Sequence, residues 1–209
     1  NRGEGLNHPW KWAGFQCCGF HHISYNMGNA FKTSPDGLPL FDDYNKDCYG
    51  DYIKNVDGSD NIALVDAGNP AYFNKYTWDP RFSHTAGVPG HPWKYDPNLI
   101  FESRGIRNGA EYGWLKSVKE LPHPGCGCLL YDGWQFNSMN KRMIRYDEVL
   151  LWKAEVLIQL DRWNEALIPI NKVRERAAHS TGWLIKADGT PVMNYHLEIY
   201  KPGENCVWS

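Results

Sequence analysis

No apolar segment of this 209-residue chain is long enough to cross a bilayer. The longest uncharged apolar runs, such as Val149 to Trp152, fall far short of the roughly 20 residues that a membrane-spanning helix needs. The first residues also lack the basic segment and following apolar segment of a secretion signal. A hydrophobic content of 42% nevertheless predicts a packed core. We therefore expect a globular protein that is either soluble or tethered to a membrane.

A basic run is also missing. The formal net charge is -2, and the Lys and Arg residues are scattered along the chain. Binding to a phosphate backbone needs a clustered positive surface, which this distribution does not supply. We therefore expect no nucleic-acid partner.

The chain contains no C-x-x-C pair, so it lacks the usual zinc-finger spacing. The six cysteines are Cys17, Cys18, Cys48, Cys126, Cys128 and Cys206. His21 and His22 lie close to the Cys17-Cys18 pair, but this arrangement and Cys126-Gly127-Cys128 both depart from the zinc pattern. We predict ordinary thiols or disulfides, and neither a metal site nor a cofactor.

A calcium-binding EF-hand is excluded by two positions, although Asp43, Asn45 and Asp47 resemble the start of its loop. Cys48 stands where the loop needs glycine, and Lys54 stands where it needs a bidentate glutamate. A less regular cation site is not excluded by these residues.

No spacing in the sequence selects a catalytic pair of carboxylates. A glycoside hydrolase needs two such groups about 5 to 10 Å apart, and loop acids are plentiful at Asp42, Asp43, Asp47, Asp57 and Asp60. Solvated loop acids would give the same pattern. We therefore assign no catalytic residue and keep hydrolysis as the weaker alternative.

Residues 1 to 140 hold most of the Gly and Pro residues, and turn signals such as Pro35-Asp36-Gly37 recur along them. Long helices are not compatible with turn-forming residues at such short intervals. The spacing of apolar residues predicts one short helix over 22–31. Short β segments are predicted over the ranges 62–65, 99–101 and 129–131.

The composition changes after residue 140, and apolar residues then recur at helical intervals over 145–177. We predict two amphipathic helices, with Asp161 as the N-cap of the second. Pro169 lies inside that second helix and is expected to bend it.

Residue sizes along this hairpin fit the tetratricopeptide pattern of large and small positions. Leu150, Ala154 and Leu157 supply the first helix, and Ala166 and Ile170 supply the second. One hairpin leaves an apolar face uncovered, and about three repeats are normally needed for stability. We therefore expect the chain to be an internal segment of a larger protein that supplies the other repeats.

Three stretches together resemble the SusD/RagB family of outer-membrane nutrient-binding lipoproteins. They are, in order, "NAFKTSPDGLPL" at 29–40, "WDPRFSHTAGVPGHPW" at 78–93 and "MIRYDEVLLWKAEVLIQLDRWNEALIPINKVRERA" at 143–177. The resemblance implies a mainly α fold, a tetratricopeptide-like helical superhelix with a large loop-rich region carrying short β segments. Residues 1–140 would be the loop-rich ligand-binding region. Residues 141–209 would be the hairpin and the loop that follows it, both within one larger SusD-like domain.

The resemblance also implies a function without catalysis. Such a protein captures oligosaccharide at the extracellular face of the outer membrane of Bacteroidota and delivers it to a SusC-like TonB-dependent transporter. Its only membrane contact would be a lipid anchor outside this chain. A RagB-like peptide carrier is the main alternative, and a tetratricopeptide scaffold that grips peptides is another.

Ten Trp and twelve Tyr residues suit a ligand with flat apolar faces. A sugar ring lies against an indole through its C–H groups while polar side chains bind its hydroxyls. The candidate ligand-binding residues are Trp10, Trp12, Asn7 and His8, all in "LNHPWKWAGFQ".

Several other residues of the three stretches are predicted to be structural. Trp78 and Trp93 are expected to be architectural, and Asp79 and Arg81 are expected to form a structural pair. Trp152 and Trp163 are expected to pack within the repeat, while Trp114 and Trp134 are left unassigned.

Overall fold

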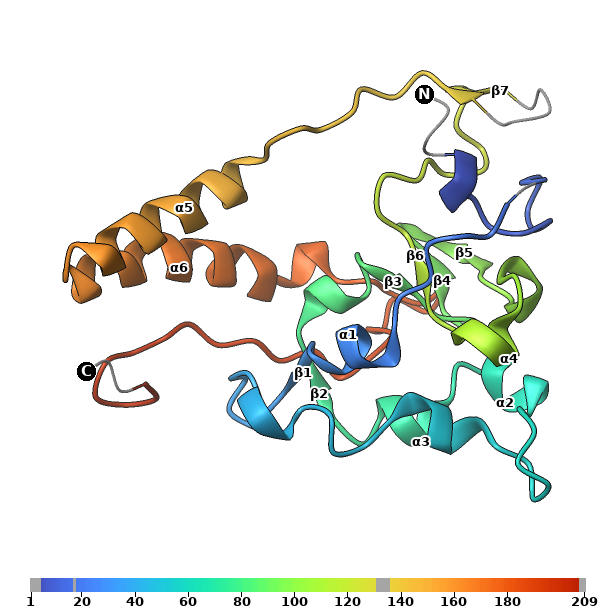
Figure 1. The fold of residues 1–209 in the computed structure, drawn as a ribbon, viewed down its shortest axis with the longest axis horizontal. Coiled ribbons are helices and arrows are strands. Elements are labelled where there is room, and N and C mark those ends of the chain that lie inside the picture. The colour runs from blue at the N-terminus through green and yellow to red at the C-terminus, as the bar shows by residue number, and fades with distance from the viewer. Residues whose placement is uncertain (1–4, 17, 131–135, 207–209) are drawn as a thin grey trace.

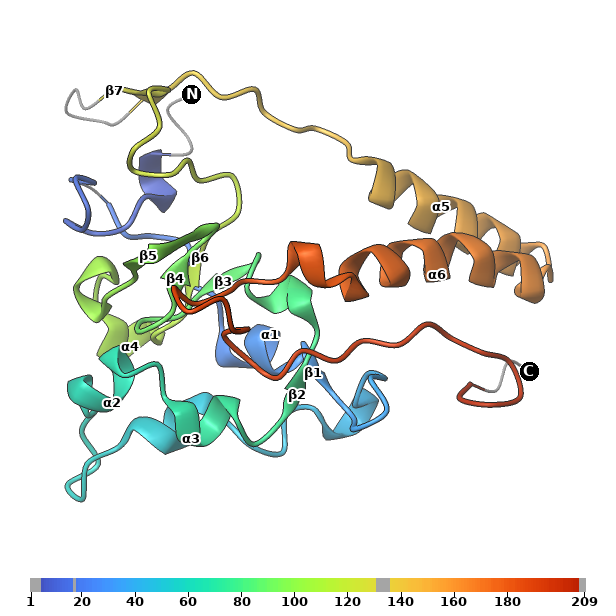
Figure 2. The same cartoon turned by 180° about the vertical axis from the view of Figure 1, so that it is seen from behind.

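A loop-rich body and a projecting two-helix hairpin are seen in the computed structural model, which describes residues 5–16, 18–130 and 136–206. The hairpin extends away from the body in both views (Figures 1 and 2). It consists of α5 (Tyr146–Gln159) and α6 (Trp163–Ala178), which confirms the helices predicted over 145–177. Within the described residues, no helix combines the length and apolarity that a bilayer crossing requires.

The body contains only short helical segments, as its glycines and prolines predict. The α-helices are α1 (Tyr25–Asn29), α2 (Ile62–Asp66), α3 (Pro70–Phe73) and α4 (Gly109–Tyr112). The 3-10 helices are η1 (Gly5–Asn7), η2 (Phe41–Asp43), η3 (Tyr49–Ile53), η4 (Pro80–Phe82), η5 (Ser103–Gly105) and η6 (Ser180–Gly182). The helix predicted over 22–31 is shorter than expected. It begins after Ser24, whose hydroxyl caps it by accepting the Met27 N–H at 3.1 Å.

The strand predicted over 62–65 is wrong, because these residues form α2. The side-chain oxygen of Asn61 accepts the Leu64 N–H at 3.1 Å and caps the helix. A run of four apolar residues fits both a strand and one turn of helix. The local N-cap therefore determines that this segment is helical. The turn buries Val65 in the core.

In the described part of the chain, the strands form four separate antiparallel pairs. The pairs are β1 (Lys32–Thr33) with β2 (Thr77–Trp78), β3 (Ala86–Gly87) with β6 (Lys116–Ser117), β4 (Pro92–Trp93) with β5 (Asp96–Ile100), and β7 (Leu129–Leu130) with β8 (Phe136–Asn137). The segment predicted over 99–101 is thus a strand at Leu99 and Ile100. The segment predicted over 129–131 is a strand at its first two residues, and Tyr131 lies outside the described residues.

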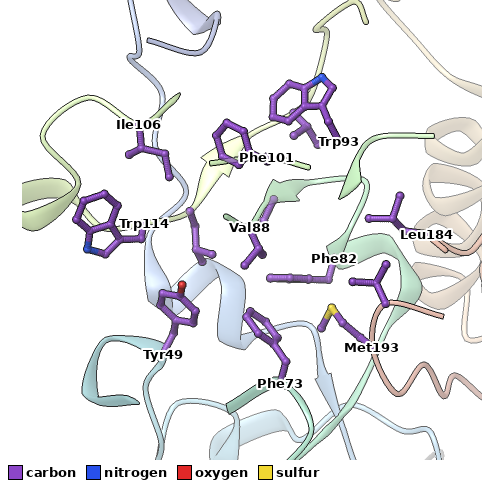
Figure 3. Close-up of a cluster of buried hydrophobic side chains, with 14 of the residues drawn as sticks. Tyr49, Phe73, Phe82, Val88, Trp93, Phe101, Ile106, Trp114, Leu184 and Met193 are labelled. Carbon is purple, nitrogen blue, oxygen red and sulfur yellow. The ribbon is translucent and has the colours of Figure 1, made fainter. Parts of the chain in front are cut away.

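Aromatic side chains fill the core of the body (Figure 3). Both indoles predicted to be architectural, Trp78 and Trp93, are buried there. The Trp78 ring lies 5.0 Å from the Phe82 ring, and the Trp93 ring lies 4.8 Å from the Phe101 ring. Large planar side chains allow such short strands to enclose a core, because each ring covers a large apolar area.

Asp79 and Arg81 form the structural pair that the sequence predicts. The Asp79 carboxylate accepts the Arg81 backbone N–H at 2.9 Å and so caps η4. The same carboxylate accepts the Arg81 guanidinium N–H from Nε at 2.9 Å. A charge with this many partners stabilises the turn between β2 and β3 and is not available for a ligand.

The segment that follows the hairpin returns to the body and completes its core. The Trp78 N–H donates to the Asn194 carbonyl at 2.9 Å, and the His196 N–H donates to the Trp78 carbonyl at 3.0 Å. Met193 and Tyr195 are buried among the body's aromatic rings. The chain therefore reaches the hairpin from the body and comes back into it.

Small residues allow close packing of α5 on α6. Ala154, Leu157 and Ala166 form a separate buried cluster, and Ala166 is 0% exposed. Asp161 is not the N-cap that the sequence predicts, since Arg162 occupies that position. Asp161 instead adopts a left-handed φ of 57°, the conformation that favours glycine at a helix turn. Helix α6 continues through Pro169.

The hairpin also carries exposed apolar side chains. Trp152 is 52% exposed, and Val156 and Ile168 are exposed as well. Trp152 therefore does not pack within the described part of the chain as predicted. The described residues contain one hairpin of this kind, so the larger superhelix remains a prediction.

The disulfides lie in the loop-rich body. Cys126 and Cys128 are joined by an S–S bond of 2.08 Å, and Cys18 is also disulfide-bonded. Cys48 has a free thiol. Cys17 and Trp134 lie outside the described residues. The prediction of ordinary thiols or disulfides is confirmed for Cys126, Cys128, Cys18 and Cys48.

Candidate ligand-binding site

The segment 5–20 is a closed loop that the body holds by its ends. The Gly19 N–H donates to the His8 carbonyl at 2.9 Å, and the Phe20 N–H donates to the Leu6 carbonyl at 3.0 Å. The Trp10 N–H donates to the Gly105 carbonyl at 2.8 Å, which fixes the middle of the loop against η5. These bonds position the loop, although its described residues form no regular strand.

A buried lysine supports the base of this loop. Lys116 is 0% exposed, and its ammonium group donates to the Asn7 side-chain oxygen at 2.8 Å and to the Phe20 carbonyl. Asn7 in turn donates to the Lys119 carbonyl at 3.0 Å. Burial lowers the pKa of Lys116 to about 7. Asn7 is therefore occupied with holding the loop to β6.

Trp12 and His8 lie inside the protein, which corrects their expected placement at the ligand surface. Trp12 is 2% exposed, and its ring lies 5.2 Å from Trp93 and 4.9 Å from Phe101. His8 is 0% exposed and lies 4.9 Å from the Phe15 ring. Burial removes both side chains from direct contact with a ligand.

Trp10 is half-buried and lies at the surface of the loop. Trp10 and Trp12 occupy alternating positions, which share one face only where the backbone is extended. Lys11 and Ala13 instead have left-handed φ values of 47° and 49°. These turns separate the two indoles, so Trp12 enters the core while Trp10 stays accessible.

Trp10 lines a surface hollow of about 700 Å³, which we call the Trp10 hollow. This volume lies within the usual range for small-molecule sites. Two lining residues, Ile106 and Trp114, also belong to the core in Figure 3. The remaining lining residues are Ile62, Ser103, Arg104, Arg107, Asn108, Gly109 and Ala110.

An arginine holds the indole of Trp10 in place. The guanidinium carbon of Arg107 lies 5.0 Å from the Trp10 ring centroid and 5.0 Å from the Phe20 ring centroid. Lys11 Nζ also lies 5.0 Å from the Trp10 centroid. Such cation–π contacts stabilise an aromatic ring at a fixed angle. Phe20 is 46% exposed, so the group presents apolar area to solvent.

Trp114, which the sequence leaves unassigned, forms part of the wall of the Trp10 hollow. Its indole N–H donates to the Asp60 carboxylate at 2.8 Å. Gly109 lies directly against the ring, because a Cβ at that position would be 2.3 Å from Trp114 Cε3. The hollow therefore has a wall held both by a hydrogen bond and by close backbone contact.

Sequence reasoning missed a second hollow of about 420 Å³. It lies where the turns at Gly68 and Gly90 meet the segment 186–192, and its lining includes Phe73 and His91. Burial lowers the pKa of His91 to about 4, so this imidazole is neutral at physiological pH. The turn signals are visible in the sequence, but their approach depends on tertiary contacts.

The loop acids considered for catalysis are mostly engaged with other protein groups. Asp47 pairs with Lys75 at 2.6 Å, and Asp60 pairs with Lys54 at 2.5 Å. Asp43 pairs with Lys46 at 2.6 Å, which leaves fewer oxygens for a loop cation. The described residues form no cluster of three or more His, Cys, Asp or Glu side chains suited to a metal.

Asp47 has the largest number of partners among these acids. Its carboxylate accepts the Tyr52 hydroxyl at 2.9 Å and also the Tyr76 hydroxyl. Burial alone would raise its pKa, but the hydrogen bonds from Lys75, Tyr76 and Tyr52 outweigh it and lower the pKa to about 2. Asp47 is therefore a charged structural centre rather than a proton donor.

Comparison with known families supports the resemblance seen in the sequence. Residues 129–198 match the model described as the SusD family. This segment contains the α5–α6 hairpin and the return of the chain to the body. No curated protein matches the chain. The Trp10 hollow lies outside the matched segment, so its assignment depends on its geometry.

Proposed function

Because residues 129–198 match the SusD family model, we propose that this protein is a non-catalytic nutrient carrier that binds oligosaccharide at the cell surface. Its binding site in this proposal is the Trp10 hollow, with Trp10 as the main contact. Asn7 positions the loop through the hydrogen bond that its side-chain oxygen accepts from Lys116. His8 and Trp12 support it from the core.

One observation carries this assignment, namely the fixed indole of Trp10 at the rim of a hollow. A pyranose ring buries apolar area against such an indole at about 25 cal/mol per Å². The Asn108 amide and the arginine N–H groups in the lining then suit the hydroxyls at the ring edge. A rigid aromatic surface also lowers the entropic cost of binding.

We also propose a cellular location and a partner for the carrier. We place it at the extracellular face of the outer membrane, held by a lipid anchor outside this chain. Its partner is a SusC-like TonB-dependent transporter that receives the oligosaccharide. The exposed apolar side chains of α5 and α6, such as Val156 and Ile168, suit stacking against further helices of a tetratricopeptide-like superhelix.

Affinity electrophoresis through gels that contain single polysaccharides tests the proposal. Retardation by at least one polysaccharide, without release of reducing sugar, is the expected result. Trp10→Ala should weaken retention at least tenfold, because it removes the ring surface. Trp152→Ala is the matched control, since it deletes an exposed indole on the hairpin and should leave retention unchanged.

Other outcomes separate the alternatives. Release of sugar would identify a glycoside hydrolase and contradict the proposal. Binding of peptides alone would identify a RagB-like peptide carrier or a peptide-gripping scaffold. Retention that survives Trp10→Ala would keep the carrier function but move its site elsewhere, for example to the second hollow beside His91.

A further inference from the structure

The Trp10 hollow has an unbalanced charge. Among the described residues, its lining includes Arg104 and Arg107 but no Asp or Glu. Arg104 is paired with Glu102, so its charge is largely compensated. Arg107 has no ion pair within residues 5–16, 18–130 and 136–206. One arginine of the lining therefore has no acidic partner in the described part of the chain.

Two carboxylates near the hollow, those of Asp66 and Asp60, are held by other groups. Asp66 accepts hydrogen bonds from the Ser103 N–H at 2.6 Å and from the Ser103 hydroxyl at 2.8 Å. Asp60 is held by Lys54 and by the indole of Trp114. Both acids bind residues of the wall of the hollow and do not pair with Arg107. The positive charge of Arg107 can therefore interact with a ligand.

The guanidinium group of Arg107 suits an anion with two acceptor oxygens. The ring centroids of Trp10 and Phe20 each lie 5.0 Å from its guanidinium carbon, so both rings lie close to the group. One edge nitrogen, Nη1, lies 3.4 Å from the Cys18 carbonyl. A guanidinium carries five N–H donors in one plane, which allows it to bind a carboxylate or sulfate through two hydrogen bonds.

Lys11 adds a second positive charge at the same indole. Its ammonium group lies 5.0 Å from the Trp10 ring centroid, and the side chain is exposed. In the described part of the chain this group also forms no ion pair. An indole with two cations close to it offers an apolar surface beside two anion-binding groups.

We propose that the ligand of the Trp10 hollow is an acidic oligosaccharide, whose ring lies on Trp10 while its carboxylate or sulfate group binds Arg107. This inference rests on the proposed carrier function and names its ligand class. Lys11 would strengthen binding through its charge without fixing the geometry. The net charge of -2 for the whole chain makes this local positive site a specific feature.

Paired polymers that differ only in charge provide the test. Polygalacturonate and its fully methyl-esterified form share one ring stereochemistry, and a sulfated galactan and a neutral galactan form the second pair. We expect the acidic member of at least one pair to bind at least tenfold more tightly. Raising the salt from about 0.05 M to about 0.5 M should weaken that binding, because exposed charges are screened. The pair that shows the difference identifies the anion.

Variants of Arg107 then locate the anion site. Arg107→Gln should lower affinity for the acidic polymer at least tenfold, and Arg107→Lys should recover only part of the loss, because lysine cannot bind in a bidentate manner. Arg176→Gln is the matched control, since Arg176 is exposed on α6 away from the Trp10 hollow. Thermal unfolding of each variant separates a lost contact from a lost fold.

The outcomes distinguish this inference from the carrier function. Tighter binding of neutral polymers would overturn the acidic ligand but leave the carrier function intact. Acidic binding that Arg107→Gln does not change would also overturn it. Failure to bind any of the four polymers or any other polysaccharide would contradict the carrier function itself.

Discussion

Arg174 of α6 donates a hydrogen bond from Nη2 to the carbonyl oxygen of Gly37 at 3.1 Å. The same guanidinium donates from Nε to the Glu198 carbonyl at 2.6 Å. Glu198 and Gly37 are also joined directly, because the Glu198 N–H donates to the Gly37 carbonyl at 3.0 Å. Arg174 therefore joins the hairpin, an early turn of the body and the returning segment at one buried point.

Arg174→Ala should lower the free energy of unfolding by about 2 to 4 kcal/mol, because it takes the Arg174 donor from the Glu198 carbonyl, removes one of the two donors to the Gly37 carbonyl and removes packed atoms. Urea unfolding at neutral pH measures the change. Arg176→Ala, at an exposed position on the same helix, should change the free energy by less than about 0.5 kcal/mol. Equal effects of the two substitutions would show that Arg174 is not a structural link.

Ala166→Leu should destabilise the hairpin. Ala166 is fully buried between α5 and α6, so a larger side chain forces the helices apart at a cost of about 1 to 3 kcal/mol. Helical circular dichroism during thermal unfolding measures this loss. Ala178→Leu, at the last residue of α6, provides a comparison at the end of the helix. A tolerated leucine at Ala166 would argue against close tetratricopeptide-like packing.

Trp12→Ala and Trp10→Ala should have opposite consequences. Trp12 fills the core beside Trp93, so its removal should cost about 3 to 5 kcal/mol of stability. Removal of Trp10 should cost no more than about 1 kcal/mol and should weaken ligand binding instead. Urea unfolding together with affinity electrophoresis separates the two effects. Loss of binding without loss of stability in Trp12→Ala would contradict the assigned placement.

Asp47→Asn should reduce stability at neutral pH and matter less in acid. The folded pKa of Asp47 is about 2, below the value of about 3.9 in an unfolded chain. The contribution of Asp47 is therefore present above about pH 4 and is lost as the pH falls toward 2. We expect a loss of about 1 to 2 kcal/mol at pH 7, allowing for solvent screening. Urea unfolding at several pH values should show the difference from wild type shrinking in acid, and a constant difference would contradict this role.

Lys116→Met should flatten the dependence of stability on pH. Burial lowers the folded pKa of Lys116 to about 7, whereas an unfolded lysine has a pKa of about 10.4. The unfolded state binds more protons between these values, so wild-type stability should rise from about pH 7 to about pH 9. Urea unfolding across this range measures the slope. Lys153→Met, at an exposed position on α5, should retain the wild-type slope. An unchanged slope in Lys116→Met would show that this ammonium group does not titrate in that range.

Helical periodicity predicts the hairpin because α5 and α6 satisfy it locally, over 14 and 16 residues. The segment 62–65 carries no such signal, and the Asn61 cap converts it to a helix. The opposite placement of Trp10 and Trp12 depends on the left-handed residues Lys11 and Ala13, which are neither glycine nor asparagine and so give little warning in the sequence. Arg107 was missed for a related reason, since only tertiary structure brings it to Trp10 and Phe20.

Trp10 and Trp12 are only two residues apart but have different surroundings, so their fluorescence can report on two different properties of the loop. Trp12 is enclosed by other rings and is protected from a soluble quencher, whereas Trp10 is partly open to solvent. In a variant that keeps Trp10 as its only tryptophan near the surface, ligand binding should change the fluorescence emission. In a variant that keeps Trp12, the emission should change when the loop detaches from the core, so ligand binding and loop detachment give two separate signals.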